Sequence, residues 1–189
     1  MPLRLKDQGL YETRREHDAC GIGAVVNING TRDHSILAYG RQILVNLTHR
    51  GAAGADETTG DGAGILFQIP HEFFVAESDR LGFSLPDPFR YGVGMVFGAK
   101  DAALRRTCDG VLTEALAYYQ LKVLGWRDVP TYSDCLGKIA LEAEPSVKQV
   151  FVDGAGLEHE LLERRLYLAR KRAEKLVKQQ LGVAAEDFY

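Results

Sequence analysis

The sequence predicts a globular domain of the α+β class, with helices and strands in mixed order. Two observations lead to this prediction. Segments whose apolar residues recur at helical spacing are interspersed with shorter segments rich in β-branched residues. The 189 residues are also 46% hydrophobic, which is enough for one domain to bury a core of its own.

The first half of the chain predicts a polar leader followed by the start of the core. Residues 1–19 are charged and lack periodicity, whereas residues 21–28 are β-rich and end at the turn-forming pair Asn29-Gly30. Residues 33–51 predict a helix that begins at Asp33 or Ser35 and ends at Gly51. The segments that follow are a loop over 52–64, a strand over 65–69, a helix over 70–78 and a loop over 82–90.

The second half predicts two strands and two long helices. The strands cover 91–98 and 146–154, and the helices cover 101–125 and 156–182, with Gly110 weakening the first helix. A short extended segment is expected at 126–131. The core side of the last helix is predicted from its leucines, Leu161, Leu162, Leu166, Leu168 and Leu176. Residues 187–189 look like the start of a further strand, so we expect the sequence to stop inside a domain.

Charge and cysteine content argue against several classes of partner. The chain has 23 Lys and Arg against 26 Asp and Glu, a net charge of −3, so neither nucleic acid nor an anionic membrane is an expected partner. Three distant cysteines without a CxxC pair predict neither disulfides nor a metal site, and His17, His34, His71 and His159 lack metal-ligand spacing. With no secretion signal and no run of about 18 apolar residues, a reducing cytoplasm is predicted.

Cys20 is the candidate nucleophile. A free cysteine is most often a small buried hydrophobe, and that alternative stays open. However, Ala19 suits a cleavage junction, and Gly21 and Gly23 leave the backbone near the sulfur unshielded. Cleavage before Cys20 would give it an α-amine with a pKa of roughly 7.7 to 8.0, a general base on the same residue as the thiol.

Two further segments could build a pocket around Cys20. Arg50 follows Cys20 by 30 positions, about the length needed for a strand, a turn and a helix that returns to the strand's start, and its guanidinium could orient a carboxylate. Equally, Arg50 and His49 could be cations at a helix C-terminus, and His49 is not proposed as a base. The glycine-rich residues 59–64 lack the Lys-Ser/Thr of a phosphate loop, so Asp61 is expected to cap the backbone or shape the pocket.

Taken together, these motifs resemble a known family. The segments concerned are ACGIGAVV, NLTHRGAAGADETTGDGAGILFQIPHEFF, GWRDVPT, EPSVKQVFV and RRLYLARKRAEK. They are similar to the N-terminal portion of the glutaminase domain of glutamate synthase large subunits, a class II glutamine amidotransferase. The resemblance covers the chain from the leader to Tyr189, and residues 46–74 are its most specific part.

The resemblance implies a fold, a reaction and a set of site residues. The fold would be the four-layer αββα sandwich of N-terminal-nucleophile hydrolases, incomplete at the C-terminus, with residues 1–19 a propeptide and 20–189 the truncated amidotransferase domain. Cys20 would hydrolyse L-glutamine to glutamate and ammonia through a thioester. The pocket would include Gly21, His49, Arg50, Asp61 and Gly62.

The resemblance also implies partners, and it leaves alternatives. The full enzyme would combine the ammonia with 2-oxoglutarate, using FMN and an iron–sulfur cluster on further domains of the large subunit, with a small reductase subunit as a possible partner. This chain itself would hold no cofactor. In a photosynthetic eukaryote the compartment would be the plastid, although no transit peptide is seen. The alternatives are a different class II amidotransferase and a non-catalytic fragment.

Overall fold

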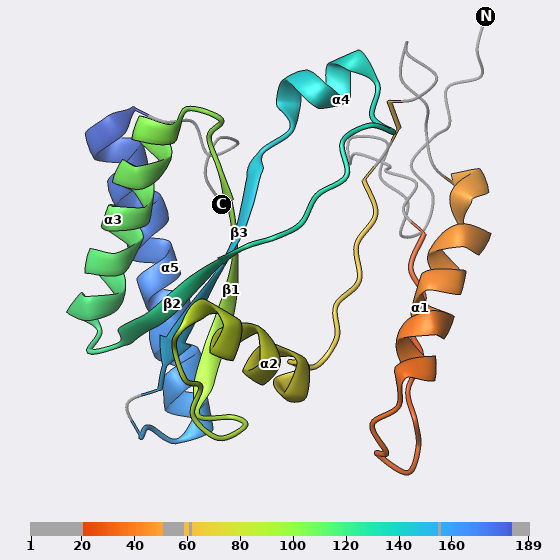
Figure 1. The fold of residues 1–189 in the computed structure, drawn as a ribbon, viewed down its shortest axis with the longest axis horizontal. Helices are drawn as coiled ribbons and strands as arrows, with labels where there is room; N and C mark the ends of the chain where they lie inside the picture. Colours follow the sequence, from red (N-terminus) through yellow and green to blue (C-terminus); the bar gives the residue numbers. More distant parts are fainter. Residues whose placement is uncertain (1–20, 51–58, 61, 155, 183–189) are drawn as a thin grey trace, which may run out of the picture. The chain divides into compact units, whose positions relative to one another are not determined.

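The computed structural model describes residues 21–50, 59–60, 62–154 and 156–182. By their contacts, the residues form two compact units, Met1–Phe67 and Gln68–Tyr189, and each unit is described here by itself (Figure 1). The first unit holds one helix, α1 (His34–Asn46), and the 3₁₀ turn η1 (Thr48–Arg50) among its described residues. The described residues of the second unit form a three-stranded sheet and four helices.

Helix α1 begins and ends with side-chain caps. Asp33 is its N-cap and accepts a hydrogen bond from the backbone N–H of Ser35 at 2.7 Å, which confirms Asp33 as one of the two predicted caps. The Ser35 hydroxyl and then the Ser35 N–H lower the pKa of the Asp33 carboxyl. At the other end, Thr48 Oγ1 donates to the carbonyl of Val45 at 2.6 Å and so adds a side-chain hydrogen bond to the backbone hydrogen bonds of the last turn.

The prediction of strands over 21–28 and 65–69 is wrong, because the structure has no strand in either segment. Both segments belong to no sheet; Ile22 is 94% exposed, and Leu66 is fully exposed. The turn after the first segment does form, since Gly30 has a φ of 68° and donates to the carbonyl of Asn27 at 2.9 Å. β-rich composition shows only that a segment suits a pleated, half-buried surface, and a strand also needs a hydrogen-bonded neighbour.

The sheet of the second unit is antiparallel, with the order β1-β3-β2. Its strands are β1 (Tyr91–Gly98), β2 (Lys122–Asp128) and β3 (Ser146–Asp153). Val150 of the central strand pairs with Gly94 on one side and with Trp126 on the other. The predicted strands over 91–98 and 146–154 are therefore confirmed to within one residue.

Helices pack on both faces of this sheet, because the side chains of β3 alternate between two apolar clusters. Val150 and Val152 face α3 (Ala102–Tyr118) and α5 (His159–Leu181), which lie side by side (Figure 1). Phe151 faces the opposite way, where it contacts Phe74 of α2 (His71–Leu81) edge to face, at 5.1 Å between ring centroids. Helix α4 (Lys138–Ala143) precedes β3.

The helix predicted over 101–125 is confirmed as far as Tyr118 and is wrong beyond it. Helix α3 ends at Tyr118, Gln120 adopts a φ of 61°, and the residues from Lys122 belong to β2 instead. The apolar run after Tyr119 fits either a helix or a strand, and pairing with β3 decides between them. Helix α4 had not been predicted.

The predicted core face of α5 needs a partial correction. Leu162 is buried, and Leu166 and Leu176 pack against the core, but Leu161 and Leu168 are 41% and 38% exposed. The other buried positions of this helix are taken by small residues and a valine, namely Ala169, Ala173 and Val177. The buried face of α5 is thus rotated around the helix, away from Leu161 and Leu168.

In the described part of the chain, no helix combines the length and the apolarity needed to cross a bilayer.

Candidate functional site

The residue that follows Cys20 lies at the C-terminal end of α1. A Cβ built on Gly21 would be 3.1 Å from Leu47 Cδ1, so the backbone at Gly21 passes close to the last residue of that helix. The turn Thr48–Arg50 starts directly after Leu47. The structure therefore brings Gly21 and the turn that contains His49 and Arg50 to the same end of α1.

Gly23 makes an equally close approach to the same helix. A Cβ there would lie 2.5 Å from Ile43 Cγ2, one helical turn before Leu47. A side chain at position 23 would force the segment away from α1. Gly21 and Gly23 thus allow this backbone to lie directly on the helix.

His49 is oriented by the helix end. Its Nδ1 is 2.9 Å from the carbonyl oxygen of Asn46, and because a carbonyl only accepts, Nδ1 carries the hydrogen. The His49 side chain is exposed, and Nε2 makes no hydrogen bond with a described residue. Such a group can accept a hydrogen bond from a ligand at this end of α1.

The other predicted site residues are placed only in part. Cys20 and Asp61 lie outside the described residues. Arg50 is described as the last residue of the 3₁₀ turn, but the position of its side chain is not. Gly62 is exposed, and a Cβ built on it would have no heavy atom within 4 Å, so no close neighbour explains the glycine at this position.

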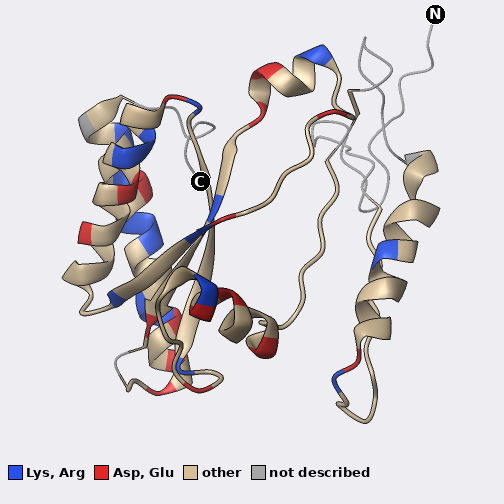
Figure 2. Ribbon diagram, in the orientation of Figure 1, with Lys and Arg blue, Asp and Glu red and all other residues tan. Residues whose placement is uncertain are grey.

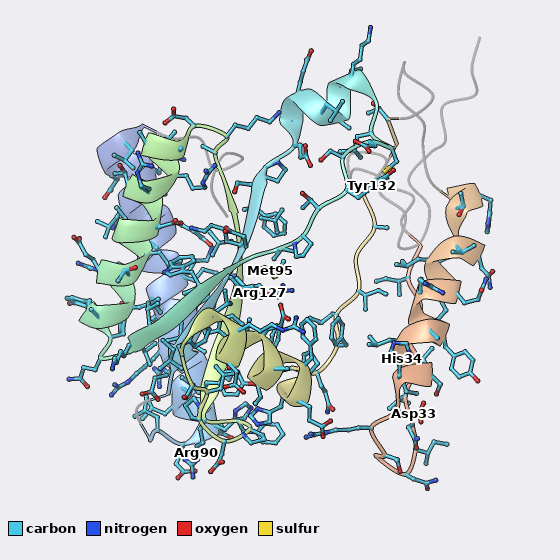
Figure 3. All side chains as sticks on the ribbon, viewed as in Figure 1. Asp33, His34, Arg90, Met95, Arg127 and Tyr132 are labelled. Atoms are coloured by element: carbon cyan, nitrogen blue, oxygen red, sulfur yellow. The ribbon has the colours of Figure 1, made fainter. Side chains whose placement is uncertain are left out.

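A polar cluster that the sequence did not predict joins α2 to the sheet. Arg127, labelled in Figure 3, lies on β2. It donates from Nε to Glu77 Oε2 at 2.8 Å and from Nη1 to Gln149 Oε1 at 3.0 Å. Its guanidinium also lies 5.4 Å from the centroid of the Phe73 ring. The hydrogen bond from Arg127 is the main reason that the pKa of Glu77 is lowered. Arg127 therefore ties α2 to both β2 and β3.

A second contact fixes the start of α2. His71 Nδ1 is 3.0 Å from the hydroxyl of Tyr91, so the first residue of α2 is bonded to the first residue of β1. Tyr91 is 3% exposed, and burial raises its pKa. Residues 65–69 connect the glycine-rich loop to α2. The contacts Arg127–Glu77 and His71–Tyr91 therefore hold the chain in place just after this connecting segment.

The described residues offer no obvious metal site. Among them, no three His, Cys, Asp or Glu side chains come together in a group that could hold a metal ion. Cys108 is 2% exposed in the core, and burial, with a smaller effect of the Asp109 charge, raises its pKa. Cys135 is exposed. Neither of these two thiols shares the environment expected of an activated nucleophile.

Comparison with known proteins identifies the family. The family described as "Glutamine amidotransferases class-II" matches residues 20–189. The large chain of a glutamate synthase [NADPH] from Bacillus subtilis is 42% identical over 89% of this chain and 11% of its own length. A glutamate synthase [NADH] from Saccharomyces cerevisiae is 44% identical over 75% of this chain and 7% of its own. A ferredoxin-dependent glutamate synthase 2 from Synechocystis is 37% identical over 92% of this chain and 11% of its own.

The chain therefore spans about a tenth of the length of these relatives. The family match begins at Cys20, the residue whose neighbour lies against the end of α1. It continues through both compact units to residue 189. This chain belongs to the class II glutamine amidotransferases.

Proposed function

We propose that this chain carries the glutaminase half-reaction of a glutamate synthase, with Cys20 as the nucleophile. The observation that supports this most directly is that the family match starts at Cys20 and leaves residues 1–19 outside it. A propeptide over 1–19 would explain this boundary, because its removal gives Cys20 a free α-amine. The names of the relatives favour a glutamate synthase over other class II amidotransferases.

The reaction follows from thiol and amine chemistry. The α-amine of Cys20, directly or through a water, takes the thiol proton, and the sulfur attacks the side-chain amide carbon of glutamine. The C–N bond then breaks, the nitrogen takes up the proton and leaves as ammonia, and a γ-glutamyl thioester remains on Cys20. Water attacks this thioester, which releases glutamate and restores the thiol.

The remaining residues are proposed to shape the pocket. Arg50 would hold the substrate or the loop of the nucleophile, since a guanidinium presents a rigid fork of donors to a carboxylate. His49, held on Asn46, would line the same end of α1 as Gly21. Asp61 and Gly62 would complete the pocket from the glycine-rich loop. These roles rest on the family resemblance and on the placement of Gly21 beside the turn.

We propose that the complete synthase transfers the ammonia to 2-oxoglutarate and uses FMN and an iron–sulfur cluster elsewhere. Iron–sulfur clusters are held by several convergent cysteine thiolates. Cys108 is enclosed between α3 and the rest of its core, whereas Cys135 is exposed in the segment before α4, so these two thiols do not fit such a site. FMN and the cluster would then belong to other domains of the large subunit, and a small reductase subunit could supply electrons.

We also propose the four-layer αββα architecture for the complete domain. The exposed apolar side chains of residues 21–28 and 65–69 support this architecture, because a second sheet packed against these segments would bury them.

A cytoplasmic or plastid compartment is proposed too. One relative, from Arabidopsis thaliana, is named a chloroplastic enzyme, and it is 35% identical over 92% of this chain.

The experiment that tests the proposed function combines the mass of the purified chain with active-site labelling. We expect mature chains that begin at Cys20, and we expect an electrophilic glutamine analogue to add once, on Cys20. Cys20→Ala should abolish both the adduct and the release of glutamate from glutamine. Cys135→Ala is the matched control, because it removes an exposed thiol and should change neither.

Two results would contradict the proposal. If every purified chain keeps Met1 or Pro2 and no analogue reacts, Cys20 has no free amine and is not an activated nucleophile. If the analogue instead labels Cys135 as fast as Cys20, the reactivity is that of an ordinary exposed thiol.

A further inference from the structure

Helix α5 has a strong excess of positive charge from its second turn onward. Between Arg164 and Lys178 there are seven Lys or Arg and one acid, Glu174, in a chain whose net charge is −3. Figure 2 shows the basic residues along α5. These seven cations fall into two groups according to whether they lie on one common exposed face of the helix.

Three of the cations are used in packing contacts. Arg165 donates from Nη1 to the carbonyl of Tyr119 at 3.1 Å, just beyond the end of α3. Arg172 lies 3.9 Å from the centroid of the Tyr118 ring, so it also faces α3. Arg170 approaches Glu174 at 3.4 Å between Nε and Oε1. These three side chains have local structural roles.

The other four cations form an outward stripe. Arg164, Lys171, Lys175 and Lys178 are all exposed, and their spacings of 7, 4 and 3 residues place them on one face of a helix. That face is opposite the buried line that begins at Leu162. We call these four residues the cationic stripe.

Ion pairs and the helix dipole account for only part of the positive charge of the cationic stripe. Lys171 pairs with Glu174 at 2.6 Å, but the other three members make no ion pair with another described residue. Lys178 lies in the last turn, where the helix dipole favours a cation. The dipole does not reach back to Arg164, and like charges at Lys171 and Lys175, or at Lys175 and Lys178, destabilise a helix.

We propose that the cationic stripe binds an acidic segment of a partner polypeptide. The stripe extends about 21 Å along the helix, from Arg164 to Lys178, so a short acidic segment of a partner can reach all four cations. Leu161 and Leu168, 41% and 38% exposed, flank the stripe and offer apolar contacts that side chains of a polypeptide can use.

Two other polyanions fit less well. A nucleic acid extends beyond the stripe and would be repelled by the rest of a chain that has more acidic than basic residues. A membrane-surface helix needs a free apolar face to insert, but the apolar face of α5, with Leu162, Ala169 and Val177, is buried in the core. The proposal is independent of the chemistry at Cys20.

The test uses the full chain and a fluorescein-labelled 20-residue peptide of Glu and Leu in a three-to-one ratio, followed by fluorescence anisotropy. The stripe variant carries R164Q, K171Q, K175Q and K178Q. The control variant carries R32Q, R41Q, R106Q and K122Q, four exposed cations outside the stripe, so that both variants lose the same charge. We expect the stripe variant to lose at least tenfold in affinity and the control to stay within twofold.

Further measurements keep the result unambiguous. Because like-charge contacts are removed, the stripe variant should melt no lower than the wild type. A charge-preserving variant with R164K, K171R, K175R and K178R should keep the affinity, which separates lost charge from lost fold. Equal losses in the stripe and control variants, or no binding of the peptide at low salt, would overturn the proposal. Tighter binding of a 20-base-pair duplex or of phosphatidylserine vesicles would overturn it as well.

Discussion

Arg127 and Glu77 form an ion pair of 2.8 Å, although 50 positions separate them in the sequence. Their side chains are 12% and 18% exposed, so the pair is largely shielded from water. Glu77 also pairs with Arg80 at 2.9 Å, but the Arg80 side chain is 78% exposed. The same carboxylate thus has one shielded and one exposed partner, which allows the two contributions to be separated.

Replacing Arg127 by Met should destabilise the second unit. The substitution leaves Glu77 and Gln149 without their shared donor while keeping most of the aliphatic volume. We expect the melting temperature to fall by about 4 °C or more. Arg80→Met is the matched control and should change it by less than about 2 °C, because exposed ion pairs contribute little. Equal shifts for the two variants would show that the shielding of Arg127 is irrelevant.

The pair should also make stability depend on pH. Arg127 lowers the pKa of Glu77 below the usual 4.5, so the ionised carboxylate stabilises the folded state above that pH. This contribution is lost as the pH falls through the lowered pKa. The melting temperature of Glu77→Gln should therefore lie below that of the wild type at pH 7, and the gap should close well below pH 4.5.

Glu142→Gln is the control for this pH dependence. Glu142 is an exposed residue of α4, and its replacement should leave the melting temperature close to that of the wild type throughout the titration. A gap for Glu77→Gln that stays constant from pH 7 to pH 3 would show that the carboxylate charge does not contribute.

Local sequence patterns predicted the elements whose periodicity is unambiguous. Helix α1 with its Asp33 cap, strands β1 and β3, and the long helix α5 all follow from apolar spacing and capping residues. The patterns failed where a segment suits two structures. The residues after Tyr119 could continue a helix, and only pairing with β3 makes them β2.

The expected proximity of Cys20 and Arg50 was based on chain length, because a strand, a turn and a helix would return the chain to its starting end. The structure has no strand over 21–28, but it places Gly21 beside Leu47, where the turn that contains Arg50 starts. Cys20 lies outside the described residues, so its proximity to Arg50 stays a prediction. The pair of Arg127 and Glu77 could not be found in this way. The two residues meet only because α2 packs on the sheet, and nothing near either one signals the other.

Two glycines of the second unit should respond in opposite directions to alanine. Gly110 lies in the interior of α3 with no heavy atom near its added Cβ, so Gly110→Ala should raise the free energy of unfolding by about 0.5–1 kcal/mol. Gly154 is buried, and its added Cβ would collide with the backbone carbonyl of Arg90, which accepts the Gly154 N–H. Gly154→Ala should lower the free energy of unfolding by about 1–3 kcal/mol.

Urea unfolding of the two variants checks this prediction. A destabilised Gly110→Ala would mean that the exposed side of α3 is covered by something other than solvent. A neutral Gly154→Ala would mean that the segment between β3 and α5 moves readily away from Arg90.

The three thiols should react with iodoacetamide in a defined order. Cys108 is 2% exposed and its pKa is raised, mainly by burial, so little thiolate is present and little of it is accessible. In the native chain Cys108 should be alkylated at least about 100-fold more slowly than the exposed Cys135, and the two rates should converge in denaturant.

If the mature chain begins at Cys20, the adjacent amine should make Cys20 the fastest of the three thiols to react. Peptide mass mapping over time measures all three rates in one sample, and native alkylation of Cys108 at the rate of Cys135 would show that the core between α3 and α5 opens readily.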